Sequence, residues 1–310
     1  MDFDLSSDER DLQAGIRELC EKRFPMQHLR DQAGSIDRGD WDALWEAGVF
    51  SINTPEEDGG LGLGMTEAVL IFEELGRALV TGPLVGTLQG AKPGGIVGVV
   101  ERGSSLVEYL DSLDTLAIMD DEGIWAVKGL VSIDAERVDR PLDPLTPLHV
   151  VHGLPQGVLV ADPEAAAWRR LEGAGLTAAL QLGIAARTTE LAVAYAKERV
   201  QFGRAVGGFQ AVKHLCADML VGTEVARAAV YAAGVTLDDP SVGDPRRAVA
   251  AAKLLADEAA FRNGKTCIQV HGGMGFTWEV DAHLYLKRAA VLATQFGAAD
   301  DHTEAVAACL

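Results

Sequence analysis

Apolar residues recur at helical spacing over two long parts of the chain. Near the N-terminus this pattern predicts a helix over about residues 66–79. In the last part of the chain it predicts three long helices, over about 176–195, 209–233 and 245–270. The last of these is rich in alanine, and alanine-rich faces let helices approach closely. We therefore expect the C-terminal part to form a helical bundle.

Polar residues indicate where some of the shorter elements begin and end. Ser6 and Glu9 have the spacing of a capping box, in which each side chain bonds the backbone N–H of the other residue. Asp40 is expected to cap a short helix that ends at Gly48. The segment 55–62 must be a loop, because proline and clustered glycines interrupt both helical and strand patterns there.

The middle of the chain has a different sequence pattern. Short β-prone runs are separated by glycine, aspartate and proline, which favours a small β-domain. These runs cover residues 96–100, 115–119, 124–127 and 148–151. The expected fold is mainly α with a small central β-domain, divided as residues 1–83, 84–162 and 163–310.

Composition narrows the classes of function and location. The chain has 310 residues and is 48% hydrophobic, enough to bury a substantial core. Its formal net charge of −19 disfavours nucleic acid as a partner. Glycine, proline or charged residues interrupt each apolar run, so no membrane span is expected. The acidic N-terminus does not resemble a signal peptide. Four scattered cysteines favour reduced thiols in the cytoplasm.

No metal site is expected from the histidines. His149 and His152 lie in a β-prone run, where their spacing points them to opposite faces. Neither is accompanied by the carboxylate or cysteine motif that would complete a set of metal ligands.

The most specific string runs from Arg199 to Met219 and includes Phe202, Gly203 and Gln210. A guanidinium at a helix end, followed by a glycine break and an amide, forms a polar corner. Arginine can make paired hydrogen bonds to phosphate. Gln210 can serve a nucleotide or a helix carbonyl, and Arg199 can equally be a surface salt-bridge residue.

A second string, from Gln269 to Phe276, places clustered glycines directly after a helix. Glycines let backbone N–H groups approach a ligand closely. A simple helix stop and turn explains the same residues. The string is not the strand–turn–helix dinucleotide fingerprint, because a helix precedes it.

Together with the loop 55–62 and the segment Phe72–Arg77, these strings resemble the acyl-CoA dehydrogenase family and occur in its order. The resemblance implies an N-terminal helical domain, a truncated β-domain and a C-terminal four-helix bundle. It also implies FAD, bound across a subunit interface. One subunit's β-domain holds the flavin ring and its neighbour's C-terminal helices hold the diphosphate and adenine side. The flavin contacts carried over by the motifs are Arg199, Phe202, Gln210, Gln269 and Gly273.

Two departures from the family pattern shape the expected function. Gly297 stands where the family usually has its catalytic glutamate. Some members instead carry the base in the first C-terminal helix; Glu172 lies one residue from that place, and the alternative for it is an exposed carboxylate at a helix start. The β-domain is also short, with no counterpart of the family's Thr-Glu-Pro…Gly-Ser string or of its Trp-containing strand.

The resemblance therefore implies one subunit of a heteromeric oxidoreductase that introduces an α,β double bond into an acyl-CoA. It is similar to the short subunits of α2β2 enzymes in actinobacterial steroid catabolism, which implies a bulky, steroid-derived acyl-CoA. The implied partners are a full-length homologous subunit, which supplies the flavin-ring site and the base, and an electron-transfer acceptor. Two alternatives stay open: a structural or regulatory subunit that binds no FAD, and a homomeric dehydrogenase that uses Glu172.

Overall fold

The computed structural model describes residues 5–90 and 92–309. Its contacts divide the chain into two compact units. The first, the helical unit, is formed by Met1–Lys22, Met65–Val80 and Ala174–Leu310, and the second, the β unit, by Arg23–Gly64 and Thr81–Gly173. The mainly helical fold with a small β region confirms the expected fold class. The expected division into three consecutive domains stays a prediction.

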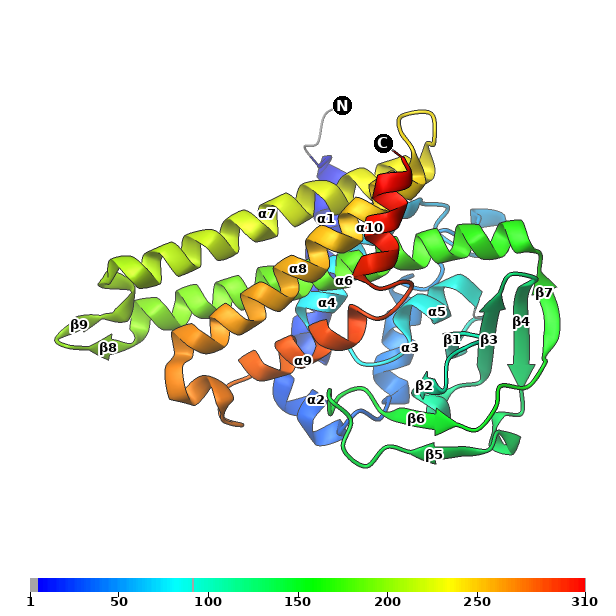
Figure 1. The fold of residues 1–310 in the computed structure, drawn as a ribbon, viewed down its shortest axis with the longest axis horizontal. Helices are drawn as coiled ribbons and strands as arrows, with labels where there is room; N and C mark the ends of the chain where they lie inside the picture. The colour runs from blue at the N-terminus through cyan, green and yellow to red at the C-terminus, as the bar shows by residue number, and fades with distance from the viewer. Residues whose placement is uncertain (1–4, 91, 310) are drawn as a thin grey trace. The chain divides into compact units, whose positions relative to one another are not determined.

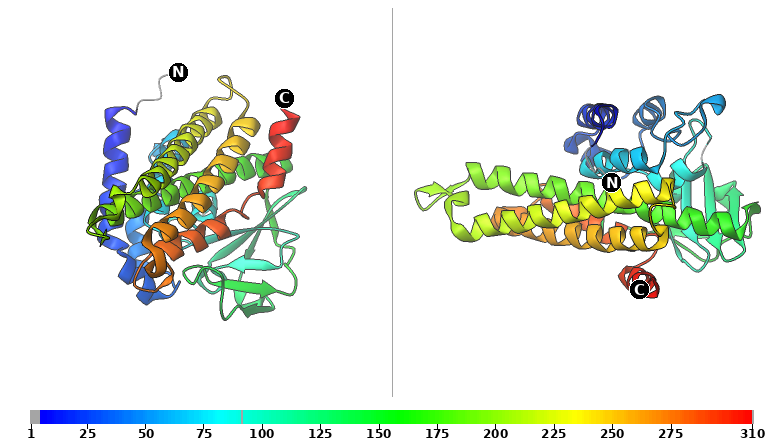
Figure 2. Two further views of the ribbon diagram at one scale, coloured as in Figure 1. Left: turned by 60° about the vertical axis from the view of Figure 1, so that its left-hand side comes forward. Right: turned by 90° about the horizontal axis from the view of Figure 1, so that it is seen from above.

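Three long helices form the centre of the helical unit and lie side by side (Figures 1 and 2). A buried amide joins them: Asn263 Nδ2 donates to Thr189 Oγ1 at 3.1 Å and to Thr223 Oγ1 at 3.0 Å. The helices of this unit are α1 (Ser7–Arg23), α4 (Met65–Arg77), α6 (Pro163–Glu198, which begins in the β unit), α7 (Gln210–Asp238), α8 (Pro245–His271), α9 (Ala282–Leu292) and α10 (Ala299–Ala308).

The helix α4 is fixed to its neighbours by buried charge and by close backbone contact. Glu73 is 3% exposed, pairs with Arg227 of α7 and accepts a hydrogen bond from Tyr231 at 2.8 Å. A Cβ added at Gly76 would lie 2.1 Å from the carbonyl oxygen of Leu180 on α6. The glycine is therefore required where the two helices cross.

Of the two predicted helix caps, the structure contains one. The capping box is confirmed, because Glu9 N–H donates to Ser6 Oγ at 3.2 Å and Ser6 N–H donates to the Glu9 carboxylate at 2.6 Å. The prediction for Asp40 was wrong. The helix α3 (Arg38–Glu46) begins earlier, and its cap is Asp37, which accepts from the Asp40 N–H at 3.0 Å.

The helix α7 passes a length and composition test for a membrane span that no segment was expected to pass from the sequence. Within the described residues, it is the one helix that is long and apolar enough to do so by length and composition. However, Arg227 in this helix pairs with the buried Glu73, and Met219 and Val230 are buried in the bundle. These contacts are typical of a bundle helix.

In its described residues the β unit contains two small sheets and three complete α-helices, and it also holds the start of α6. The strand β1 pairs in parallel with β3, and the remaining pairs are antiparallel. All four β-prone runs form strands, while three short strands were missed. The four-stranded sheet has the order β1 (Val97–Glu101), β3 (Thr115–Asp120), β4 (Gly123–Lys128), β7 (Val158–Ala161); the other has the order β2 (Leu106–Glu108), β6 (Leu148–Val151), β5 (Ala135–Arg137); the helices are α2 (Met26–Gln32), α3 and α5 (Leu84–Gly90).

Candidate functional site

A short hairpin connects α6 to α7 at one end of the helical unit (Figure 1). It consists of β8 (Val200–Gln201), β9 (Arg204–Ala205) and the turn η4 (Val206–Gly208). Phe202 and Gly203 form its tip in the left-handed region, with φ of 53° and 75°. The Val206 N–H donates to the Arg199 carbonyl at 2.7 Å, so the hairpin folds back onto the end of α6.

The expected flavin contacts of this connection face outward. Arg199 and Gln210 are exposed, and Phe202 is 90% exposed. Arg199 makes no salt bridge within the described residues, so its guanidinium is available to a ligand. The surface ion pair considered from the sequence therefore has no partner in the part of the chain that the structure describes.

The second expected contact region follows α8 directly. Gln269 is exposed in the last turn of α8, and its carbonyl accepts from the Gly272 N–H. A Cβ added at Gly273 would meet nothing within 4 Å, whereas one at Gly275 would lie 2.6 Å from the Ile268 carbonyl oxygen. The turn η5 (Gly272–Phe276) thus folds tightly against α8 and leaves the backbone at Gly273 open to solvent.

The structure brings these two regions together. Tyr195, one turn before Arg199, stacks on His271, which lies between Gln269 and Gly273, with ring centroids 4.2 Å apart. The two strings are therefore neighbours at one end of the bundle although α7 and most of α8 separate them in sequence. This contact was missed, because no spacing in the sequence indicates that Tyr195 and His271 meet.

The turn between α9 and α10 contains Gly297, with φ of 101°. A Cβ at this position would lie 2.9 Å from Nε2 of His302, so the imidazole occupies the space that a longer side chain would need. His302 is 8% exposed and makes a backbone hydrogen bond with Phe296. Its Nε2 atom has no hydrogen-bond partner within residues 5–90 and 92–309.

A buried ion pair lies behind this turn. Lys253 Nζ, with a fully buried side chain, donates to Asp257 Oδ2 at 2.6 Å and to the Leu292 carbonyl at 3.3 Å. Burial lowers the pKa of Lys253 and raises the pKa of Asp257, and the ion pair opposes both shifts. Burial, and secondarily the Lys253 charge, lowers the pKa of His302. The Lys253–Asp257 ion pair and the Leu292 carbonyl that Lys253 bonds form a structural lock at the end of α9.

Glu172 does not lie where the sequence suggested. It is only 9% exposed and falls in the third turn of α6 rather than at its start. Arg169, one turn earlier, donates to its carboxylate at 2.8 Å. The expectation of an exposed carboxylate at the helix start was therefore wrong.

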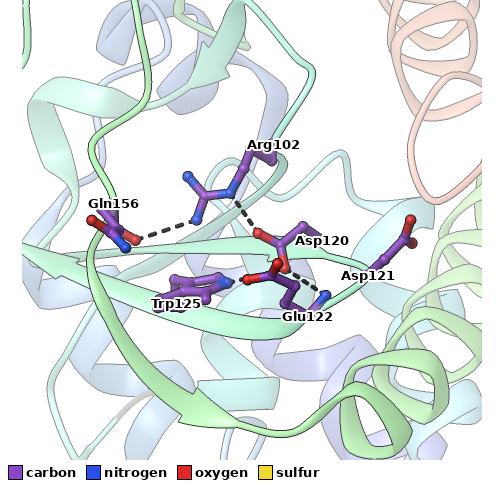
Figure 3. Close-up of a pocket in the computed structure, with 6 residues that line it drawn as sticks. All are labelled: Arg102, Asp120, Asp121, Glu122, Trp125 and Gln156. Carbon is purple, nitrogen blue, oxygen red and sulfur yellow. Dashed lines mark hydrogen bonds and ion pairs between the residues drawn. The ribbon is translucent and has the colours of Figure 1, made fainter.

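The β unit has a hollow of about 440 Å³ on its four-stranded sheet (Figure 3). Arg102 bonds Asp120 and holds the pKa of that carboxyl at about 2, and the Trp125 indole donates to the same carboxylate. Trp125 lies on β4. The side chains of Arg102, Asp120 and Trp125 therefore form a hydrogen-bonded cluster in this hollow. In the described residues, no group of His, Cys, Asp and Glu is arranged to hold a metal ion.

Comparison with known proteins identifies the family. Residues 6–97 match the model of the acyl-CoA dehydrogenase N-terminal domain, and residues 165–310 match that of the C-terminal domain. The chain is 36% identical over 275 residues to the acyl-CoA dehydrogenase IpdE2 of Mycobacterium tuberculosis, covering 83% of each chain. The chain belongs to the acyl-CoA dehydrogenase family.

Further similar proteins agree with the assignment of this chain to the acyl-CoA dehydrogenase family. IpdE2 of Mycolicibacterium smegmatis is 34% identical over 307 residues, covering 91% of this chain and 93% of the relative. A chain of the ChsE4–ChsE5 complex from Mycobacterium tuberculosis has the same fold, with a TM-score of 0.83 at 21% identity, covering 99% of this chain and 98% of that one. Butyryl-CoA dehydrogenase from Megasphaera elsdenii has a TM-score of 0.82 at 19% identity, covering 100% and 99%.

The family assignment confirms two expectations for this acyl-CoA dehydrogenase. The chain is an oxidoreductase polypeptide whose reaction acts on the CH–CH bond of an acyl-CoA. Its cofactor is FAD.

Proposed function

We propose that this chain holds the nucleotide half of FAD in a heteromeric acyl-CoA dehydrogenase, while a homologous partner subunit supplies the flavin-ring site and the catalytic base. One observation carries the proposal. The chain places exposed side chains that can bind a nucleotide at one end of its bundle. At Gly297, where the family has its base, the imidazole of His302 fills the space that a side chain would need.

The residues at the bundle end suit the diphosphate and adenine side of FAD. Arg199 can pair with a phosphate, and the amides of Gln210 and Gln269 can each donate and accept hydrogen bonds. The open backbone at Gly273 admits close approach, and the exposed ring of Phe202 offers an apolar contact. All five groups face solvent, so no other group of the described chain has to be displaced.

The lack of a carboxylate at Gly297 determines which subunit supplies the catalytic base. When bound, FAD supplies a hydride acceptor for α,β-dehydrogenation. The reaction also requires a base within hydrogen-bond reach of a weakly acidic α-proton, beside a polarised thioester carbonyl. Loss of a general base costs roughly 10²–10⁴-fold in rate, and Gly297 has no side chain to serve as one. The partner subunit therefore provides it.

An apolar surface on α7 supports a partner subunit. Leu220, Val221 and Val225 are 53%, 62% and 48% exposed on this helix. Adjacent exposed apolar side chains are typical of surfaces that another protein covers. Obligate subunits bury large, apolar interfaces, which fits an α2β2 assembly. The ChsE4–ChsE5 complex is a two-component assembly with a chain of this fold.

The substrate that we propose is a bulky, steroid-derived acyl-CoA. A variant of the steroid ACAD Tcur3481–Tcur3483 has the same fold, with a TM-score of 0.83 at 22% identity, covering 97% of both chains. Electrons from the reduced cofactor pass to an electron-transfer acceptor. A cytoplasmic location agrees with the free cysteines Cys20, Cys216, Cys267 and Cys309.

The test is to purify the chain alone and co-expressed with a full-length homologous subunit. Arg199→Ala and Gln269→Ala should each lower FAD retention by the complex, by roughly ten- to a hundredfold for Arg199, which bonds a charged group. Arg246→Ala, at the opposite end of α8, is the matched control and should leave FAD retention unchanged. Unchanged retention in both site variants would favour the structural subunit that binds no FAD.

The homomeric alternative has its own test. A lone chain that is yellow and fully active would overturn the heteromeric proposal. If Glu172 were the base, Glu172→Gln would abolish turnover while leaving assembly intact. We expect turnover to persist, because Arg169 already binds this carboxylate.

A further inference from the structure

Two aromatic rings join the ends of α6 and α8. Tyr195 and His271 stack with a centroid separation of 4.2 Å and an angle of 29° between their planes. Tyr195 Oη also donates a long hydrogen bond, 3.4 Å, to the His271 carbonyl. The contact therefore links the last turns of two helices that carry the two halves of the proposed nucleotide site.

The imidazole of His271 is held in a fixed orientation. Its Nδ1 lies 2.8 Å from the carbonyl oxygen of Cys267, one turn earlier on α8, so Nδ1–H donates to that oxygen. His271 is 8% exposed, and Cys267 is fully buried in a small cluster with Ile268 and Met219. The ring is thus a rigid surface for Tyr195 to stack on.

Each ring lies close in sequence to proposed cofactor contacts. The Arg199 N–H donates to the Tyr195 carbonyl at 2.8 Å, which ties the guanidinium-bearing residue to the stacked tyrosine. His271 lies two residues after Gln269 and two before Gly273. A change in the distance between the rings would therefore move Arg199 relative to Gln269 and Gly273.

We propose that Tyr195 and His271 are positioning residues that set the spacing between the two halves of the nucleotide site. This inference rests on the proposed function, because it concerns the same five cofactor contacts. Neither ring needs to touch the cofactor. The stack fixes the hairpin on one side and the turn η5 on the other, and preorganised groups bind with a smaller loss of conformational freedom.

The experiment compares Tyr195→Ala, Tyr195→Phe and His271→Ala with the unchanged protein. The first readout is hydrogen exchange of residues 199–209 in the full chain, and the second is FAD retention by the co-expressed complex. Tyr195→Ala and His271→Ala should speed exchange of this segment and weaken FAD retention, each by roughly two- to tenfold, the worth of an aromatic pair. Tyr195→Phe keeps the stack and should behave like the unchanged protein.

A matched control separates positioning from general stability. Val230→Ala removes buried apolar volume from the middle of α7, so it destabilises the bundle without touching the stack. It should leave exchange of 199–209 and FAD retention unchanged under native conditions. If Val230→Ala loosens the segment as much as Tyr195→Ala does, the stack is merely packing and the inference is overturned.

The outcomes also separate this inference from the proposed function. A complex that retains no FAD even without substitutions would sink the proposed function, while the exchange measurement would still test the stack. Unchanged exchange of 199–209 in Tyr195→Ala would overturn the positioning role directly. If Tyr195→Ala does not fold, Tyr195→Leu keeps apolar bulk without the ring and replaces it in both measurements.

Discussion

Two Phe-Gly pairs turn the chain through the left-handed region, and their surroundings are opposite. Phe202 and Gly203 have φ of 53° and 75°, and Phe296 and Gly297 have φ of 53° and 101°. The first pair is open, since Phe202 is 90% exposed and an added Cβ at Gly203 would meet nothing within 4 Å. The second pair is closed by His302.

The difference shows what each turn can do. The open turn presents an aromatic ring outward beside exposed polar side chains, which suits a ligand that comes from outside the chain. The closed turn makes its contacts internally, through the imidazole of His302, and Lys253 of α8 bonds the end of α9 just before this turn. A turn filled in this way stabilises the bundle and cannot accommodate a carboxylate that faces a substrate. Four predictions test this contrast.

The largest expected effect is on the lock behind the closed turn. Lys253→Met would leave the half-buried Asp257 carboxylate without its cation, and it would remove one of the two donors to the Leu292 carbonyl, which also accepts from the Gln295 N–H. Breaking a buried ion pair costs about 3–5 kcal/mol of unfolding free energy, measurable by denaturant titration. Lys265→Met, at an exposed position of the same helix, should change stability by less than about 0.5 kcal/mol. Equal effects of the two substitutions would mean that the lock does not stabilise the fold.

A matched pair of glycine substitutions compares the turns directly. Gly203→Ala should cost about 1–2 kcal/mol, from backbone strain alone. Gly297→Ala adds displacement of the His302 ring and should cost about 2–4 kcal/mol in the same denaturant titration. For the same reason, Gly297→Glu should not create a base in this chain. A smaller cost at Gly297 than at Gly203 would show that the closed turn has room.

Much of the fold could be predicted from local pattern. Helical periodicity located α4, α6, α7 and α8, and the motif residues from Arg199 to Gly273 were found by their order along the chain. The short strands β2, β5 and β7 escaped, because three or four residues carry little periodicity.

What could not be predicted depends on contacts between distant residues. A lysine among alanines on the apolar face of α8 was a signal that Lys253 is buried, but its acceptors on α9 are set by packing. Likewise, no spacing indicates that Tyr195 meets His271 or that His302 fills the space at Gly297. Asp40 was misread because Asp37, three residues earlier, is the residue in extended backbone before the helix.

Acid should weaken the closed turn. Burial lowers the pKa of His302 in the folded chain, so the unfolded chain binds its proton more readily. The stability that the neutral ring contributes is complete above its ordinary pKa of about 6.5 and is lost as the pH falls below that value. We expect the unfolding free energy to fall more steeply from about pH 8 to about pH 5 in the unchanged protein than in His302→Leu. Parallel pH profiles would show that the ring's protonation does not affect folding.

The smallest effect on stability is expected at the open turn. In Phe202→Gly, glycine removes the strain of the left-handed backbone, which stabilises the fold, but it also gives the unfolded chain more conformational entropy, which destabilises the fold. Because these two effects oppose each other, the unfolding free energy should change by less than about 1 kcal/mol. Phe296→Gly relieves the same backbone but also removes a half-buried ring, so it should cost more. FAD retention by the complex should show the reverse order, falling for Phe202→Gly and holding for Phe296→Gly. Because an exposed ring in strained backbone adds little to folding, a loss of cofactor without a loss of stability would identify Phe202 as a residue kept for the ligand.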